Sequence, residues 1–253
     1  MSKPSDNHEQ EEQLAEGTLM SHLLELRSRI MKAATAVVVV FLALAPFTQR
    51  VFKYVSAPLI AVLPEGSEMI ATDVASPFLT PFKTTLYVAL FIAMPVVLFQ
   101  VWQFVAPGLY KREKRFAIPL LVSSIVLFYT GMAFAYFVVF RLMFSFFARV
   151  VPGGVTMAPD ISAYLSFVLG IFLAFGLAFE VPIATVMLIW SGLVSIKTLR
   201  GGRRYVFLGA FIIGAVLTPP DVFSQTLLAL PMYALYEGGL IMARIMLPEK
   251  TQE

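Results

Sequence analysis

The chain has 253 residues, of which 58% are hydrophobic, and its mean hydropathy of +0.81 excludes an ordinary soluble domain. It has no cysteine, which excludes disulfides, thiol nucleophiles and thiolate metal sites. The net charge of +3 does not indicate nucleic-acid binding, because the basic residues lie beside apolar segments, where anionic lipid and membrane topology account for them.

The N-terminal residues 1–17 are acidic and lack a signal-peptide pattern, so we expect a disordered cytoplasmic tail. Residues 18–32 place apolar side chains on one helical face, which predicts an interfacial helix leading into the membrane. Residues 18–247 are expected to form one transmembrane domain. A short cytoplasmic tail follows at residues 248–253.

Six apolar segments carry no charged residue or one, and each is predicted to cross the membrane as a helix. They are residues 33–49, 84–110, 116–140, 161–196, 205–220 and 222–236. If they cross in alternation, both tails and the second and fourth connections share one side, which holds 14 of the 19 basic residues. Because lysine and arginine accumulate in short cytoplasmic loops, that side is the cytoplasm. The sequence therefore predicts an all-α polytopic membrane protein with six transmembrane helices and both termini inside.

Prolines at positions 95, 119, 182 and 231 lie inside these segments, and each should kink its helix by removing a backbone hydrogen bond. The last two segments would span about 24 Å of a hydrocarbon core near 30 Å thick. We therefore expect two short final helices around which the bilayer thins. The connection at residues 64–81, rich in proline and small residues, is expected to form a structured outer cap.

Glu180 is the one acidic residue inside the fourth apolar segment, roughly 14 Å from its cytoplasmic end. Because a carboxyl group is costly in the membrane, such residues usually have a function. Glu180 is a candidate proton-linked switch or a polar contact for a partner's transmembrane helix. The alternative is a carboxyl that bonds a neighbouring helix for structure alone. In either case its side chain should face protein.

Glu25 and Glu113 are cytoplasmic acids that lie within basic clusters at the membrane surface. Carboxylates suit the recognition of arginine, whose planar fork can donate two parallel hydrogen bonds that lysine cannot reproduce. The alternative is local pairing, of Glu25 with Arg29 one turn further on and of Glu113 with its basic neighbours. Both interpretations stay open at this point.

Two polar residues mark the outer start of the last segment. Asp221 follows two prolines and is expected to cap the last helix at its N-terminus. Gln225 lies one turn further on, in the apolar layer, where it could bond a partner helix or serve internal packing.

Enzymatic chemistry is not indicated. His8 and His22 both lie in the cytoplasmic N-terminal region, so the membrane part has no histidine for a metal pair or for a serine nucleophile. The glycines are scattered without a phosphate-binding loop. We expect no cofactor, no metal and no enzymatic activity.

Seven strings in the chain resemble a known family in the same order and over nearly the full length. They are HLLELR at 22–27, VSAPL at 55–59, MIATDVASPFLTPFK at 69–83, FQVWQFVAPGLYKREKR at 99–115, GMAFAYFVVF at 131–140, FGLAFEVPI at 175–183 and LTPPDVFSQTLLALPMY at 217–233. The chain thereby resembles the TatC family, the multi-spanning receptor subunit of the twin-arginine (Sec-independent) protein translocase.

The resemblance implies a cupped, glove-like bundle in a prokaryotic plasma membrane, present in several copies per complex. It implies binding of twin-arginine signal peptides and export of folded proteins with single-span TatA- and TatB-type subunits, driven by the protonmotive force. The residues that it assigns to the signal-peptide site are Glu25, Leu26, Arg27, Phe104 and Glu113.

The resemblance assigns roles to other residues as well. It implies that Glu180 lies on the concave face, and that Asp221 and Gln225 lie where the partner subunits dock. Pro58 would belong to the outer cap. Arg141 stands where relatives would have proline, which concerns the outer end of the third helix.

A proton-coupled small-solute transporter that uses Glu180 as its carrier is the main alternative. It would need a midplane pocket with several convergent polar groups, whereas the chain has one intramembrane acid and few partners for it. A membrane assembly scaffold is a third possibility. Signal-peptide binding distinguishes it from the receptor.

Overall fold

The computed structural model describes residues 4–60, 69–105, 114–150, 158–218 and 221–246, and these residues are almost entirely helical. The α-helices are α1 (Pro4–Leu44), α2 (Thr48–Ile60), α3 (Ser76–Val105), α5 (Lys114–Phe134), α6 (Phe140–Val150), α7 (Ile161–Ala178), α8 (Val181–Trp190), α9 (Ile196–Gly201), α10 (Arg203–Leu217) and α11 (Val222–Met246). A 3₁₀ turn, Ala45–Phe47, joins α1 to α2, and a π-helical turn, η2 (Ala135–Val139), joins α5 to α6. The predicted all-α fold is confirmed.

Five helical segments of the described chain are long and apolar enough to cross a membrane. They are Met20–Ala57, Ser76–Val105, Ile118–Phe147, Ile161–Trp190 and Val222–Met246. The predicted fifth crossing corresponds to α10, whose 15 residues reach about 22 Å. The structure therefore has the predicted short helix between the fourth and last candidate spans, and a sixth crossing by α10 stays a prediction.

The last helix is longer than its apolar run. α11 has 25 residues, because the helix continues through Glu237 instead of ending before it. Arg203 Nη2 lies 2.6 Å from Glu237 Oε2, and the Tyr233 hydroxyl donates to Glu237 Oε1 at 2.9 Å. These two partners accommodate the carboxylate of Glu237, so the helix continues beyond the end of the apolar segment.

The first helix also extends further than predicted. α1 begins at Pro4 and includes most of the segment predicted as a separate disordered tail. The glutamate, glutamine, alanine and leucine residues of that segment are good helix formers, and they favour continuation of the helix toward the N-terminus.

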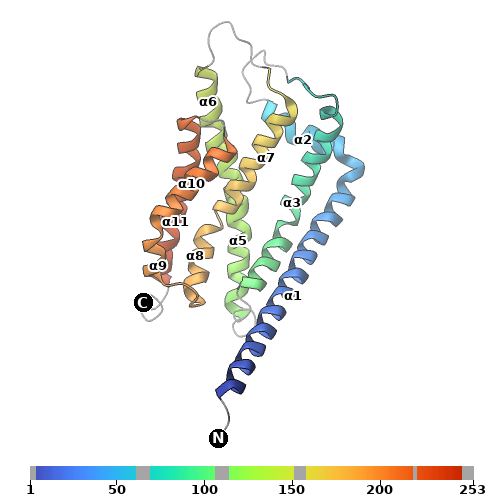
Figure 1. The fold of residues 1–253 in the computed structure, drawn as a ribbon. Coiled ribbons are helices and arrows are strands. Elements are labelled where there is room, and N and C mark those ends of the chain that lie inside the picture. Colours follow the sequence, from blue (N-terminus) through green and yellow to red (C-terminus); the bar gives the residue numbers. More distant parts are fainter. Residues whose placement is uncertain (1–3, 61–68, 106–113, 151–157, 219–220, 247–253) are drawn as a thin grey trace.

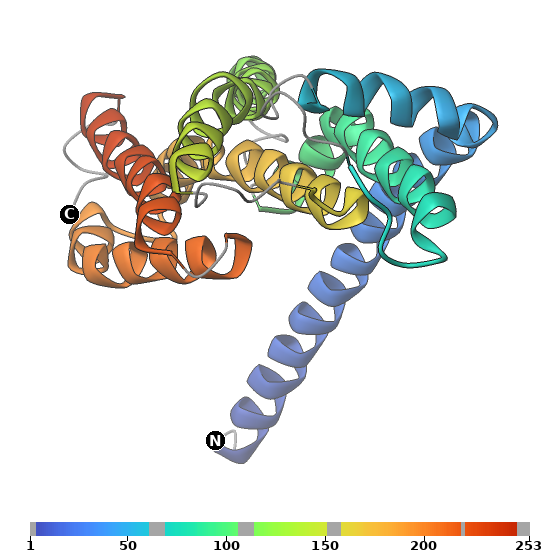
Figure 2. The ribbon, with the colours of Figure 1, turned by 90° about the horizontal axis from the view of Figure 1, so that it is seen from above.

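The bundle has two distinct ends. The start of α1, the end of α3, α9 and the end of α11 lie at one end, which we call the base (Figure 1). α2, the end of α6 and the start of α7 lie at the other end, which we call the top. Seen from above, the helices do not close into a ring: α1, α2 and α3 lie at one side, α10 and α11 at the other, and α5 and α7 between them (Figure 2).

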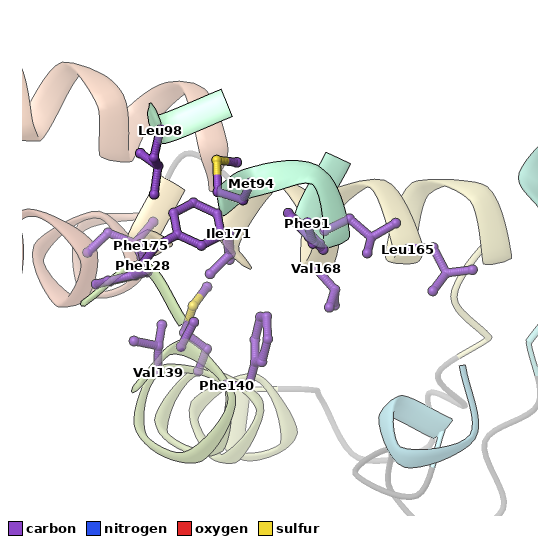
Figure 3. Packing of buried hydrophobic residues seen from close by; sticks show 14 of the residues in the cluster. Phe91, Met94, Leu98, Phe128, Val139, Phe140, Leu165, Val168, Ile171 and Phe175 are labelled. Atoms are coloured by element: carbon purple, nitrogen blue, oxygen red, sulfur yellow. The ribbon is translucent and has the colours of Figure 1, made fainter. Parts of the chain in front are cut away.

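The hydrophobic core forms where α7 packs between α3, α5 and α6. Its residues include Phe91, Met94 and Leu98 of α3, Phe128 of α5, Val139 and Phe140 at the π-helical turn, and Leu165, Val168, Ile171 and Phe175 of α7 (Figure 3). α1 has no buried residue in its apolar window and packs mainly on α3. Exposed apolar side chains of this kind suit contact with lipid.

Two glycines allow helices to approach closely. A Cβ atom at Gly131 of α5 would overlap the backbone carbonyl of Phe175, and one at Gly239 of α11 would lie 2.9 Å from Pro182 Cα. Small residues at such crossings are typical of membrane bundles, because they let backbones touch. These contacts hold the centre of the bundle together.

Asp160 connects the loop at residues 69–75 to the start of α7. Its Oδ1 accepts from Ala163 N at 2.8 Å, and its Oδ2 accepts from the backbone and hydroxyl of Thr72 at 3.0 and 2.8 Å. Ile70 and Asp160 also form an isolated parallel bridge. These hydrogen bonds lower the pKa of Asp160 to about 2. Residues 69–75 thus form part of an ordered cap, while residues 64–68 of the predicted cap lie outside the described residues.

Only one of the four predicted proline kinks breaks its helix. α7 ends at Ala178 and α8 begins at Val181, with Pro182 in the first turn of α8, where no backbone N–H is needed. Pro95, Pro119 and Pro231 lie inside α3, α5 and α11, which continue through them. Glu180 is therefore at a junction between two helices, and not within one continuous helix.

Candidate functional site

A guanidinium group is held between α1 and α3 toward the base of the bundle. Arg29 Nη2 lies 3.1 Å from Glu25 Oε1. Arg29 Nη1 donates to the side-chain oxygen of Gln100 at 3.3 Å and to that of Gln103. We call these four residues the arginine cluster. Three oxygen acceptors from two helices thus surround one planar guanidinium, and such groups bind arginine with more specificity than lysine.

Helical spacing explains why the arginine cluster forms. Glu25 and Arg29 are four residues apart on α1, and Gln100 and Gln103 are three apart on α3, so each pair lies on one helix face. α1 and α3 pack against each other. The two faces meet, and the long arginine side chain bridges them.

The arginine cluster is open to solvent on the side of Glu25. The side chain of Glu25 is 37% exposed and that of Arg29 is 23% exposed. Gln100 is only 8% exposed and forms the buried wall of the site. A ligand can therefore reach the carboxylate first and the glutamine oxygens behind it.

Phe104, another predicted signal-peptide residue, lies at the same α1–α3 seam, whereas Arg27 is two residues from both Glu25 and Arg29 and so lies on the opposite face of α1. The ring of Phe104 stacks on His22, with 4.4 Å between ring centroids, and His22 lies one turn before Glu25. Leu26 is half-buried and Arg27 is exposed. Glu113, the second predicted acid of the site, lies outside the described residues.

A second polar group is buried in the middle of the bundle. Trp102 Nε1 of α3 donates to the hydroxyl of Ser124 of α5 at 2.8 Å, and the Ser124 hydroxyl in turn donates to Glu180 Oε2 at the α7–α8 junction. Glu180 is 8% exposed, so it faces protein as predicted. Within the described residues, its other oxygen, Oε1, is buried without a hydrogen-bond partner.

One stretch of α3 serves both polar groups. Gln100 and Gln103 bind Arg29, and Trp102 lies between them in sequence and points to Ser124. The sequence reasoning missed Gln100, Gln103, Trp102 and Ser124 as site residues. A signal was present, since two amides and an indole in four residues are unusual in an apolar segment.

The predicted partner-docking residues have contacts within the chain. Asp221 Oδ1 accepts from Ser224 N at 2.7 Å, which is the predicted N-terminal cap of α11. Gln225 Nε2 donates to the carbonyl oxygen of Phe211 in α10 at 3.0 Å. Gln225 therefore makes an internal packing contact with α10, and docking of a partner there stays a prediction. Pro58, predicted for the outer cap, lies in the last turn of α2, at the top.

Two apolar cavities flank α7 and α8. The first, of about 650 Å³, lies between α3, α7, α10 and α11. The second, of about 630 Å³, lies between α5, α8 and α11. Their linings are almost wholly hydrophobic, including Leu173, Val206 and Ile213 in the first and Phe134, Leu235 and Ile241 in the second. Such cavities suit an apolar helix or a lipid chain more than a polar solute.

No group of three metal-binding side chains gathers in the part of the chain that the structure describes. The polar side chains that do gather, in the arginine cluster and around Glu180, are hydrogen-bond donors and acceptors placed between helices. Their chemistry is that of binding a cationic group and of holding helices together.

Comparison with known proteins places the chain in a family. The model of the Sec-independent protein translocase protein (TatC) matches residues 21–231. The TatC protein of Azotobacter chroococcum is 62% identical over 222 residues, covering 88% of this chain and 87% of the relative. The TatC protein of Escherichia coli K12 is 58% identical over 226 residues, covering 89% and 88%.

A solved structure agrees with these relatives. The crystal structure of a twin-arginine translocase receptor, TatC, superposes with a TM-score of 0.79 at 37% sequence identity, covering 88% of this chain and 98% of that one. The chain is a multi-pass membrane protein that belongs to the TatC family of Sec-independent protein translocase proteins.

Proposed function

We propose that the chain is the signal-peptide receptor of a twin-arginine translocase in a prokaryotic plasma membrane. The base of the bundle, where α1 begins and α11 ends, faces the cytoplasm, so that both termini are cytoplasmic. Signal peptides that carry two arginines bind around the α1–α3 seam through Glu25, Leu26, Arg27 and Phe104, together with Glu113. With TatA- and TatB-type subunits, the protein exports folded cargo at the expense of the protonmotive force.

The arginine cluster is the observation that carries this proposal. Its carboxylate and two amide oxygens already hold a guanidinium group, that of Arg29, with Nη2 lying 3.1 Å from Glu25 Oε1. Glu25 is also more exposed to a ligand from outside than Arg29 or Gln100. Arginine recognition at this seam therefore needs no rearrangement of the acceptors.

Three further features support the remaining parts of the proposal. The apolar cavity of about 650 Å³ beside α7 suits the apolar part of a signal peptide. Asp221 and Gln225 lie at the start of α11, where a partner helix could pack beside α10. Glu180 is a buried acid beside Ser124, suited to respond to peptide or partner binding.

A binding measurement tests the receptor. The detergent-purified protein is titrated with a fluorescent twin-arginine signal peptide and, in parallel, with its twin-lysine counterpart. We expect preference for arginine in the wild type and loss of that preference in Glu25→Gln and Glu113→Gln.

Glu237→Gln is the matched control for this measurement. Glu237 is also a carboxylate paired with an arginine, but it lies on α11. Its substitution removes the same charge, and we expect the arginine preference to remain. Equal binding of both peptides by the wild type would contradict the receptor proposal, and uptake of a small solute by the protein alone in liposomes would favour the transporter.

A further inference from the structure

The guanidinium in the arginine cluster belongs to the chain itself. Arg29 donates to all three acceptors of the cluster, from Nη2 to Glu25 and from Nη1 to Gln100 and Gln103. The proposed recognition site for a cargo arginine is thus already filled by an arginine of the receptor. A cargo residue that binds the same oxygens has to displace it.

We propose that Arg29 is a built-in competitor that occupies the cargo-arginine site at rest, and that Gln100 and Gln103 are ligands of the cargo guanidinium once Arg29 has left. This inference rests on the proposed receptor function. It adds residues to the site and a step to binding: the exchange of one guanidinium for another.

The exchange is physically feasible because the ion pair of Arg29 is weak, although hydrogen bonds to Gln100 and Gln103 add to it. Its ion pair with Glu25 joins residues one turn apart on the same helix, and both side chains are partly exposed, at 23% and 37%. Exposed pairs of this spacing contribute little to stability. The flexible side chain of Arg29 can turn outward to water without any movement of α1.

The buried acceptors explain why the incoming group should be arginine. Gln100 is 8% exposed, so its side-chain oxygen would lose its hydrogen bond when Arg29 leaves. The guanidinium of a cargo arginine supplies the same planar set of donors as that of Arg29. A lysine ammonium is a compact charge that cannot reach Glu25 and both glutamines from one position.

The competitor also sets the affinity that a ligand of the site must have. Because Arg29 is attached to the same helix as Glu25, its effective concentration at the site is high, and it lowers the apparent affinity of every ligand that needs the same oxygens by the same factor. A ligand that gains further contacts at the seam, such as those at Phe104, overcomes this competition. Removal of Arg29 should therefore raise the affinity of each such ligand and leave the preference for arginine unchanged.

The test compares Arg29→Met with Lys32→Met in the peptide titration. Lys32 lies three residues further along α1 and is exposed, so its substitution removes the same charge near the site but leaves the cluster intact. We expect Arg29→Met to bind the twin-arginine peptide at least about tenfold more tightly than Lys32→Met, which corresponds to about 1.4 kcal/mol. A twin-lysine peptide that uses the same oxygens should gain by the same factor, so that the ratio of the two affinities stays unchanged.

Two more variants keep the test decisive. Arg29→Lys preserves the charge and most of the side-chain packing but not the planar fork, and we expect affinities between those of the wild type and Arg29→Met. Adding Gln103→Leu to Arg29→Met should weaken twin-arginine binding severalfold, since the cargo guanidinium loses a ligand. Thermal unfolding confirms that each variant is folded.

The outcomes separate this inference from the receptor proposal. If the wild type prefers arginine through Glu25 but Arg29→Met and Arg29→Lys bind no more tightly than Lys32→Met, then Arg29 is a supporting residue and the inference is wrong. If the wild type shows no preference for arginine, the receptor proposal fails first.

Discussion

The indole nitrogen of Trp102 lies 2.8 Å from the hydroxyl oxygen of Ser124, and this hydroxyl is shared with Glu180. One small side chain on α5 therefore joins α3 to the junction between α7 and α8. The serine accepts from the indole and donates to the carboxyl group, so both of its hydrogen-bonding functions are in use. This arrangement makes Ser124 more important to the bundle than its size suggests.

Ser124→Ala should destabilise the protein by about 1 to 3 kcal/mol, because the indole and the carboxyl group would both stay buried without their partner. Ser123→Ala is the control, since Ser123 is exposed on the same helix. Unfolding in detergent measures the difference. Equal stability of the two variants would mean that water or another group replaces the serine.

Gly131→Ala should destabilise the bundle by about 1 to 3 kcal/mol, because the new methyl group would overlap the carbonyl of Phe175. Gly209→Ala is matched, since Gly209 is also helical but has open space within 4 Å of the added atom. That variant should be neutral or slightly stabilised. Thermal unfolding of both proteins checks the prediction, and a stable Gly131→Ala would show that α5 and α7 can separate without cost.

Asp160→Ala should lower the unfolding temperature near neutral pH, because the carboxylate holds Thr72 and the first turn of α7. Its pKa falls from an ordinary value of 3.8 to about 2 in the folded chain. The stabilisation is therefore complete above about pH 4 and is lost as the pH falls through 2.

A pH series checks this sign. The difference in unfolding temperature between wild type and Asp160→Ala should be constant from pH 7 to 5 and should shrink below pH 4. Asp73→Ala, in the same loop, leaves the hydrogen bonds of Asp160 in place and is the control for loss of a carboxyl group there. A difference that grows on acidification would contradict the assignment.

Gln225→Leu separates internal packing from partner docking. The variant loses the hydrogen bond to the carbonyl of Phe211, and bonds of this kind in membranes contribute about 0.6 kcal/mol. We expect a small loss of stability but a large loss of export in cells if a partner binds there. Thr226→Val, which loses only a bond within its own helix, should export normally. A variant with normal export would assign Gln225 to internal packing alone.

Much of the fold could be predicted because the membrane imposes it. Apolar segments without charge have to be helical in lipid, and basic residues mark the connections between them. The errors lie where polar side chains find partners in the chain. The apolar segment that predicts the last helix ends before Glu237, but α11 continues through Glu237, which pairs with Arg203 and accepts from Tyr233. At Pro182 the predicted interruption is present, between α7 and α8, and it places Glu180 at the junction.

The candidate site could be predicted only where its contacts are local. The pairing of Glu25 with Arg29 follows from a spacing of four residues on one helix. The two glutamines come from a helix more than 70 residues away, and their position depends on how α3 rotates against α1. The same holds for Ser124 and Glu180, which are 56 residues apart in sequence. Single-sequence patterns do not contain such rotations.

The π-helical turn at Ala135–Val139 gives the third crossing a spare residue. A wide turn of this kind takes up one extra amino acid locally, and the helices on either side keep their faces. Deletion of the exposed Phe137 should therefore leave a continuous α-helix there, with Met143 still directed into the core. Loss of a residue elsewhere in α5 would instead turn everything beyond it by about 100°. This helical segment should thus tolerate loss of a residue at the π-helical turn. Loss of a residue elsewhere in the segment changes which side chains face lipid.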